Sequence, residues 1–337
     1  MPSSKIYSDF APEIVWIRDT VASDINELPA SARTEASHYV TKRLRILSGT
    51  EGIRLDPALG RPVPYAAFWF ADAFNLRRPE FVRHMGLCLV YNSLTTTLKD
   101  DLKDGRVKEP ATLERLRRFW SAKYDGIMKS AFPPSSSFWR TASLARDEWR
   151  RYDEWNASFD QTSRFDPYSD RFLGESSRYF VAVVYPALAG IAVQADASRE
   201  VPKIGRFLRR FSAGWRIFDD LMDWNEDIDA SKFNRSSILY YVMKRVPSGT
   251  ALGRDIVMGS FLSQEFVEDT YGAILRNLRK ARDVVRVFGN NYLSKFMEEQ
   301  LDFHSRRRDT LLRSSRSFFS ALKGSLTKSR VRKAGAA

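Results

Sequence analysis

Residues 81–104 read FVRHMGLCLVYNSLTTTLKDDLKD, an apolar run that ends in a cluster of aspartates. Residues 215–227 read WRIFDDLMDWNED and repeat this arrangement later in the chain. In both stretches apolar side chains recur three and four positions apart, which is the spacing of one face of an α-helix. We therefore predict two helices, each with an Asp-Asp-x-x-Asp string behind an apolar segment.

Helical spacing also dominates the rest of the chain, and alternating runs of Val, Ile and Thr are nearly absent. Short stretches rich in Pro, Gly, Ser and Asn separate the periodic segments. The expected helical segments are 66–74, 81–98, 113–130, 137–155, 176–195, 204–224, 236–243, 261–288 and 292–319. Pro186 predicts a kink within one of them. The pattern predicts an all-α fold with one domain over residues 1–305 and a basic tail over 306–337.

Composition excludes several classes of protein. The mean hydropathy of -0.39 argues against a bundle of membrane-spanning helices, and the first residues lack the apolar core of a signal peptide. The single cysteine, Cys88, has no partner for an internal disulfide, and three histidines do not suffice for a Cys/His zinc site. We expect a soluble, cytoplasmic protein.

The formal net charge of +13 is concentrated near the C-terminus, where ten Lys and Arg residues follow His304 and Asp309 is the only acid. The sequence leaves three interpretations of this tail open: a disordered end, a lid over a site, or an amphipathic helix on an anionic membrane. Phe318, Phe319, Leu322 and Leu326 have the spacing of such a helix. Motifs typical of nucleic-acid-binding proteins are absent, so we expect no nucleic-acid partner.

The two aspartate strings indicate metal chemistry. Asp100 and Asp104 lie four residues apart, as do Asp219 and Asp223, and like charges at this spacing destabilise an isolated helix. Divalent metal ions would neutralise them, and oxygen ligands without His or Cys favour Mg²⁺, which typically shares carboxylates with a substrate phosphate. A single string has a simpler explanation as a solvated acidic turn. Two strings in one chain favour metal–diphosphate chemistry.

On these motifs the chain resembles the class I isoprenoid synthases, which comprise the trans-prenyltransferases and the class I terpene cyclases. The resemblance covers about residues 60–232. It implies an antiparallel helical bundle around a central apolar cavity, in which three Mg²⁺ ions, or Mn²⁺ in their place, clamp an isoprenyl diphosphate. It also allows a homodimer.

The resemblance assigns roles to individual residues. Asp100 and Asp104 would bind two metal ions, with Asp101 behind them or in an ion pair. Asp219, Asp223 and Asp227 would hold the third ion, with Asp220 in support. The residues expected to bind diphosphate are Arg61, Arg178, Arg216, Lys232 and one arginine of 306–308, here Arg307. The aromatic residues expected to line the cavity are Phe68, Trp69, Phe180, Trp215 and Phe218, although packing in a helical core is the simpler explanation for any single aromatic.

Departures from the family pattern decide between its two activities. Chain-elongating prenyltransferases bind isopentenyl diphosphate with a Gly-Gly-Lys-Arg string, a histidine before the first motif and an arginine pair after it. This chain has Leu59-Gly60-Arg61-Pro62, Ser93 and Gly105-Arg106-Val107-Lys108 instead. The interpretation is a terpene synthase that ionises an allylic diphosphate and cyclises or quenches the cation. Chain elongation is the alternative, and a catalytically inactive partner subunit is the third.

Overall fold

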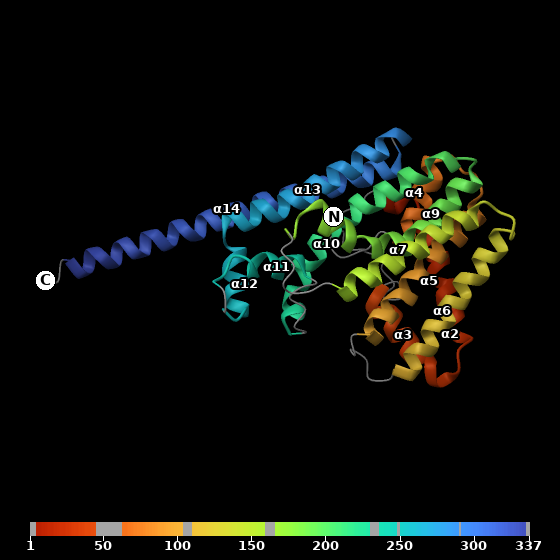
Figure 1. The fold of residues 1–337 in the computed structure, drawn as a ribbon, viewed down its shortest axis with the longest axis horizontal. Coiled ribbons are helices and arrows are strands. Elements are labelled where there is room, and N and C mark those ends of the chain that lie inside the picture. Colours follow the sequence, from red (N-terminus) through yellow and green to blue (C-terminus); the bar gives the residue numbers. More distant parts are fainter. Residues whose placement is uncertain are drawn as a thin grey trace. The chain divides into compact units, whose positions relative to one another are not determined.

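The computed structural model describes residues 5–44, 63–103, 110–158, 166–229, 236–247, 250–289 and 291–334. Over these residues every regular element is a helix, which confirms the all-α prediction (Figure 1). The α-helices are α1 (Lys5–Ser8), α2 (Ala11–Asn26), α3 (Ala30–Leu44), α4 (Val63–Ala73), α5 (Pro79–Lys103), α6 (Pro110–Ala131), α7 (Phe138–Ser158), α8 (Asp170–Ser176), α9 (Arg178–Gln194), α10 (Val201–Asp229), α11 (Ser237–Met243), α12 (Arg254–Phe261), α13 (Gln264–Val285) and α14 (Tyr292–Ala334).

The chain divides into two compact units, each built from three separate segments. Unit 1 comprises Met1–Arg150, Tyr179–Leu208 and Val284–Phe296. Unit 2 comprises Arg151–Arg178, Arg209–Asp283 and Met297–Ala337. The unit boundaries fall inside helices, because α7, α9, α10, α13 and α14 each contribute residues to both units. The sequence-based boundary at residue 305 likewise lies within α14.

The core of unit 1 is formed around α4 and α5. Eight of the residues of α4, from Val63 to Ala71, are buried, and α5 packs against both α4 and α6. Trp69 of α4 stacks on Phe296 with a centroid distance of 4.5 Å, and Tyr91 of α5 stacks on Trp120 of α6 at 5.6 Å. These large rings account for much of the apolar burial that stabilises a helical unit of this kind.

The predicted helix over 176–195 is two helices, because α8 ends at Ser176 and α9 begins at Arg178. Helix α9 continues through Pro186 to Gln194. A proline inside a helix leaves the carbonyl four residues earlier without its usual donor. One turn before the proline, the carbonyl of Val183 accepts a hydrogen bond of 2.7 Å from the Asn92 side chain of α5. This bond ties α9 to α5 one turn before the proline, and it reaches the carbonyl of Val183, not that of Ala182, which lies four residues before Pro186.

In unit 2, α10 and α13 approach each other closely at Gly214. A Cβ atom at that position would lie 3.2 Å from the carbonyl oxygen of Ile274 and 3.3 Å from the side chain of Leu278. Glycine therefore lets the two helix backbones come together one turn before Phe218, the residue that precedes the second aspartate string. No single helix in the described ranges is long and apolar enough to cross a membrane, although α8 and α9 together pass that test as a bent pair.

Candidate functional site

The first aspartate string lies at the end of α5 in unit 1. Asp100 is half-buried, whereas Asp101 is buried and its Oδ2 accepts a hydrogen bond of 2.8 Å from the Tyr39 hydroxyl of α3. The preceding residue, Lys99, places its ammonium group 4.1 Å from the ring centroid of Trp149. Asp104 lies outside the described residues. Asp101 thus connects α5 to α3, and Asp100 retains access to solvent.

The second string lies in the C-terminal half of α10 in unit 2. Asp220 is 3% exposed, and its Oδ2 accepts a hydrogen bond of 2.7 Å from the backbone N–H of Ser237, the first residue of α11. Its Oδ1 lies 3.0 Å from Nε of Arg216, one turn earlier on α10. Both carboxylate oxygens are therefore engaged, and Asp220 links α10 to the first turn of α11.

Burial raises the pKa of Asp220 to about 7, although the charge of Arg216 and the hydrogen bonds from Ser237 act in the opposite direction. The negative charge of Asp220, with smaller contributions from Asp219 and Asp227, raises the pKa of the Arg216 guanidinium. Arg216 therefore interacts mainly with the aspartates of its own helix. The sequence predicts Arg216 as a diphosphate ligand, and in the structure its Nε pairs with Asp220 while 34% of its side chain is exposed.

The other three aspartates of the second string and its extension, Asp219, Asp223 and Asp227, are accessible to solvent. Asp219 and Asp227 are half-buried and Asp223 is exposed. Their spacing of four residues places them on successive turns of one helix face. Both strings thus have the same organisation, since the second aspartate is buried and hydrogen-bonded while the first is partly accessible.

One predicted diphosphate ligand, Arg307 of α14, lies beside this part of α10. Its guanidinium carbon is 5.4 Å from the ring centroid of Phe218, and its Nη2 is 3.6 Å from the sulfur of Met222. Phe218 and Met222 directly precede Asp219 and Asp223 in the sequence. Unit 2 therefore brings a cation from a distant segment to the helix that carries the second string.

The remaining predicted cations differ in their placement. Arg178, the first residue of α9, forms an ion pair with Glu175, with a distance of 2.6 Å between Nε and Oε2. This pair lies at the junction of α8 and α9. Arg61 and Lys232 lie outside the described residues.

Sequence reasoning missed His304, which lies on α14 one turn before Arg307. It is 1% exposed, and its ring meets that of Phe218 edge-on at a centroid distance of 4.8 Å. Burial, with a smaller contribution from the charge of Arg307, lowers the pKa of His304 to about 3. The imidazole is therefore neutral at physiological pH. A lone histidine in a polar stretch gives no sequence signal for such a position.

Two of the aromatics predicted to line a cavity are core residues of unit 1. Phe68 stacks on Phe10 at 5.3 Å, and the Nε1 of Trp69 donates a hydrogen bond of 3.1 Å to the carbonyl of Ile6. Phe68 also packs against α5 at Gly86, which is about 21 Å along that helix from Asp100 at 1.5 Å per residue. Their contacts thus favour the packing interpretation.

The other predicted aromatics include two on α10. Trp215 is half-buried and stacks on Phe211 at a centroid distance of 6.0 Å, whereas Phe218 is buried. Phe180 on α9 is half-buried. Of this group, Phe218 is the residue that lies next to both Arg307 and the second string.

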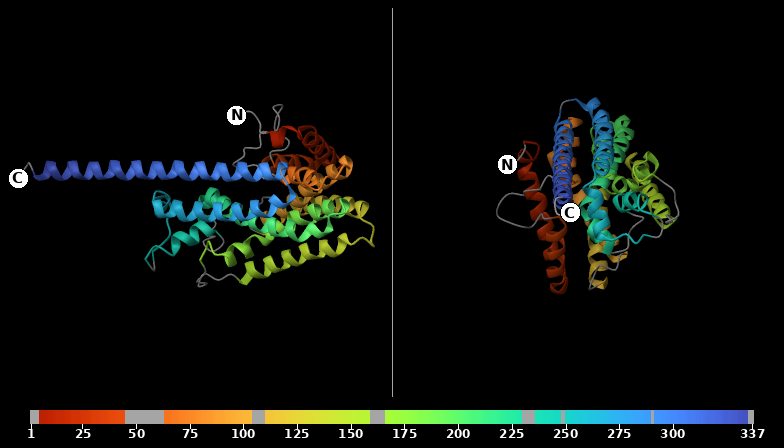
Figure 2. Two further views of the ribbon diagram at one scale, coloured as in Figure 1. Left: turned by 90° about the horizontal axis from the view of Figure 1, so that it is seen from above. Right: turned by 90° about the vertical axis from the view of Figure 1, so that its left-hand side faces the viewer.

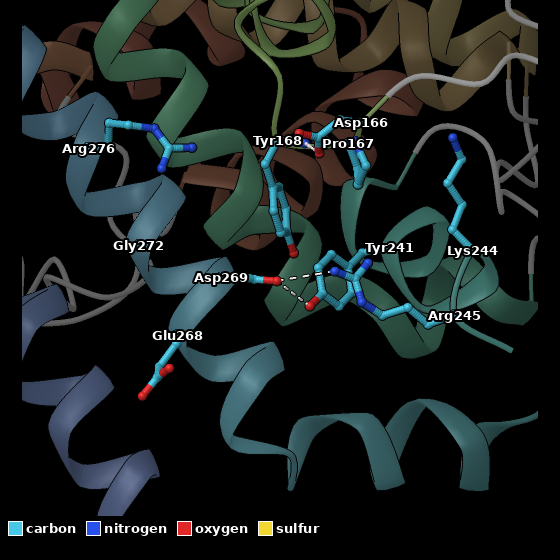
Figure 3. Close-up of a pocket in the computed structure, with 10 residues that line it drawn as sticks. All are labelled: Asp166, Pro167, Tyr168, Tyr241, Lys244, Arg245, Glu268, Asp269, Gly272 and Arg276. Atoms are coloured by element: carbon cyan, nitrogen blue, oxygen red, sulfur yellow. Dashed lines mark hydrogen bonds and ion pairs between the residues drawn. The ribbon is translucent and has the colours of Figure 1, made fainter.

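Unit 2 also contains a pocket of about 500 Å³ that none of the predicted residues lines (Figure 3). In it the hydroxyl of Tyr241 donates a 2.6 Å hydrogen bond to Asp269, which also accepts a hydrogen bond of 3.2 Å from Arg245. The Arg245 guanidinium lies 3.5 Å from the Tyr241 ring centroid. The lining residues are Asp166, Pro167, Tyr168, Tyr241, Lys244, Arg245, Glu268, Asp269, Gly272 and Arg276. Three of these side chains are acidic and three are basic, so their formal charges cancel.

Across the described ranges, no group of three or more His, Cys, Asp and Glu side chains is arranged to hold a metal ion. The donors that the strings offer are nevertheless carboxylate oxygens, which is the ligand chemistry that Mg²⁺ prefers. No protein-family model and no curated protein matches this chain. The fold and the two strings thus define an all-helical protein with paired acidic motifs.

Proposed function

We propose that this protein is a Mg²⁺-dependent class I terpene synthase. It would ionise an allylic isoprenyl diphosphate, cyclise or quench the resulting carbocation, and release diphosphate. The observation that carries the proposal is the shared organisation of the two strings, in which the second aspartate is buried and hydrogen-bonded while the first is partly accessible. Such an arrangement fixes the helix with the second carboxylate and leaves the first partly exposed to solvent.

The accessible carboxylates are the proposed metal ligands. Asp219, Asp223 and Asp227 of α10 would hold one ion, and Asp100, together with Asp104, would hold the others. Bound magnesium would act as a Lewis acid on the departing diphosphate. Asp101 and Asp220 hold their helices in place through Tyr39 of α3 and Ser237 of α11, so we assign them a positioning role.

Arg307 is the best-supported of the proposed diphosphate ligands. Its planar guanidinium offers two parallel donors to phosphate oxygens, and the ring of Phe218 holds it without neutralising its charge. Phe218 in turn provides an apolar face next to the aspartates, which suits a reaction that generates a cation. The neutral His304 beside it adds no second positive charge to this region.

Ser93 favours a one-substrate reaction over chain elongation. Ser93 lies on α5 at the position where the chain-elongating prenyltransferases, which this chain resembles, have a histidine. Its side chain is buried, with 5% exposed. A buried hydroxyl provides no positive charge for a second diphosphate. Elongation therefore remains the alternative to be tested by product analysis.

The proposal is tested by incubating the full chain with Mg²⁺ and geranyl, farnesyl or geranylgeranyl diphosphate, with and without isopentenyl diphosphate. A hydrocarbon or alcohol from an allylic substrate alone is the expected result. Longer diphosphates that require isopentenyl diphosphate would instead establish chain elongation. A lack of any product together with a lack of Mg²⁺-dependent diphosphate binding would favour the inactive partner subunit.

A matched pair of variants on α10 tests the assignment of ligands. Asp219→Ala is expected to abolish turnover and leave the helical circular dichroism unchanged. Glu226→Ala removes an exposed acid from the same helix and is expected to retain activity. Equal activity of the two variants would show that Asp219 is not a metal ligand.

A further inference from the structure

Helix α14 continues to Ala334 as one unbroken element (Figure 2). The Oγ of its residue Ser315 donates a hydrogen bond of 2.5 Å to the carbonyl of Leu262, just after the end of α12. Beyond this contact α14 extends for another 19 residues, which at 1.5 Å per residue is about 28 Å. In Figures 1 and 2, none of the other described helices of unit 2 runs beside its last turns.

This last part of α14 carries charge of one sign. It contains six basic residues, and no acid follows Asp309. The basic residues are Arg316, Lys323, Lys328, Arg330, Arg332 and Lys333. Neighbouring like charges on a helix repel each other, so solvent or an anionic partner must screen the positive charge of this segment.

The same segment has an apolar periodicity. At 3.6 residues per turn, positions 315, 318, 322 and 326 recur on one face of the helix, and three of them are Phe318, Leu322 and Leu326. The side chain at position 315 contacts Leu262, just after the end of α12. In the sequence, apolar residues therefore follow Ser315 at helical spacing.

Exposed apolar side chains lie on α12 and just beyond its end, next to this point. Met258 is 48% exposed and Leu262 is 36% exposed, and the two lie one turn apart. Leu262 is also the residue whose carbonyl accepts the Ser315 hydrogen bond. Exposed apolar side chains thus lie next to the point where α14 contacts Leu262, at the start of its basic segment.

We infer that the end of α14, together with Met258 and Leu262, is a docking surface for a lipid bilayer that contains anionic lipids. The basic residues attract the anionic headgroups, and the apolar side chains enter the boundary between headgroups and acyl chains. A second copy of the chain is a poorer occupant, because two such helices would repel each other. Nucleic acid would satisfy the charge and leave the apolar stripe without a partner. This inference does not depend on the proposed enzymatic function.

The experiment is co-sedimentation of the full chain with vesicles of phosphatidylcholine, alone or mixed with phosphatidylserine. Binding is expected with the mixed vesicles and is expected to weaken with added salt, since salt screens exposed charges. Each basic residue at an anionic surface contributes about five-fold to partitioning. The triple variant Lys323→Gln, Lys328→Gln, Arg330→Gln should therefore lower binding by about a hundredfold.

A control triple variant removes the same charge from exposed positions elsewhere, as Arg206→Gln, Arg276→Gln and Arg279→Gln. It should bind mixed vesicles nearly as the parent does. Met258→Ser with Leu262→Ser should weaken vesicle binding, and circular dichroism verifies that each variant is folded. Equal binding to both kinds of vesicle, or equal effects of the two triple variants, would overturn the inference.

Two further measurements test the alternative partners of this surface, which are nucleic acid and a second copy of the chain. Duplex DNA that binds as tightly as the mixed vesicles, and that is released by the same triple variant of α14, would assign the surface to nucleic acid. A stable dimer in light scattering that the α14 variant dissociates would assign it to a second copy. Either result would replace the membrane proposal.

Discussion

Replacing Asp220 by alanine separates the two roles that we assign within the second string. The carboxylate of Asp220 is 3% exposed and accepts a 2.7 Å hydrogen bond from the Ser237 N–H. Above the pKa of about 7, where the carboxylate of Asp220 is charged, loss of a hydrogen bond to it costs about 1.5 to 3 kcal/mol of unfolding free energy. The variant also leaves Arg216 without its 3.0 Å ion pair.

The cost of losing the ion pair with Arg216 is smaller than the cost of losing a fully buried ion pair. Breaking a fully buried ion pair costs about 3 to 5 kcal/mol, but the Arg216 side chain is 34% exposed, so solvent screens much of the remaining charge. We therefore expect Asp220→Ala to lower the free energy of unfolding by about 3 kcal/mol in total. Asp220→Asn keeps an acceptor for Ser237 in the same volume, and its loss should be less than half as large.

The assay is urea denaturation followed by far-ultraviolet circular dichroism, with Asp219→Ala as the matched control. Asp219 is half-buried and precedes Asp220 directly, so its replacement should change unfolding by well under 1 kcal/mol. If Asp220→Ala and Asp219→Ala changed the free energy of unfolding equally, the distinction between a buried aspartate that fixes the helix and an accessible one would be refuted. It would also remove the observation that carries the proposed function.

Three other outcomes follow from the structure. Tyr39→Phe should lower stability by about 1 to 2 kcal/mol in thermal melts, because Asp101 loses a buried hydrogen bond. The pKa of His304 is about 3 in the folded chain and about 6.5 when unfolded, so its contribution is constant at high pH and stability falls as pH drops below 6.5. The loss is about 2 kcal/mol at about pH 5, and His304→Phe should abolish this dependence in urea titrations. Gly214→Ala should lower the free energy of unfolding by about 1 to 3 kcal/mol, because the new Cβ would lie 3.2 Å from a backbone carbonyl. Gly126→Ala has open space around it and should raise the free energy of unfolding by about 0.5 kcal/mol. The urea midpoints of the two variants test this difference.

The helices differ in how readily the sequence indicates them. Helices α4 to α7, α10 and α13 follow from apolar residues three and four apart. Helix α3 was missed because its buried face begins with Ala32 and Ala36, whose small side chains give little hydrophobic periodicity. Helix α2 was missed although Ile14, Ile17 and Val21 carry that spacing.

The candidate site was predictable as a pattern of charges and not as a set of contacts. The partner of Asp101 is Tyr39, and that of Asp220 is Ser237, and both partners come from other helices. Such contacts depend on tertiary packing, which periodicity within one helix does not encode. The ion pair of Arg216 was within reach of the sequence, since Asp220 lies four residues later on the same helix.

The geometry of an α-helix nevertheless explains why both strings divide their first two aspartates in the same way. In an Asp-Asp-x-x-Asp string the first and fifth residues share a face, while the second lies about 100° around the helix from the first. A helix that keeps its first and fifth carboxylates accessible therefore turns the second toward its neighbours in the fold. A carboxylate in that position destabilises the fold unless a donor meets it. Tyr39 and Ser237 are two unrelated solutions to this one requirement, a hydroxyl in unit 1 and a backbone N–H in unit 2.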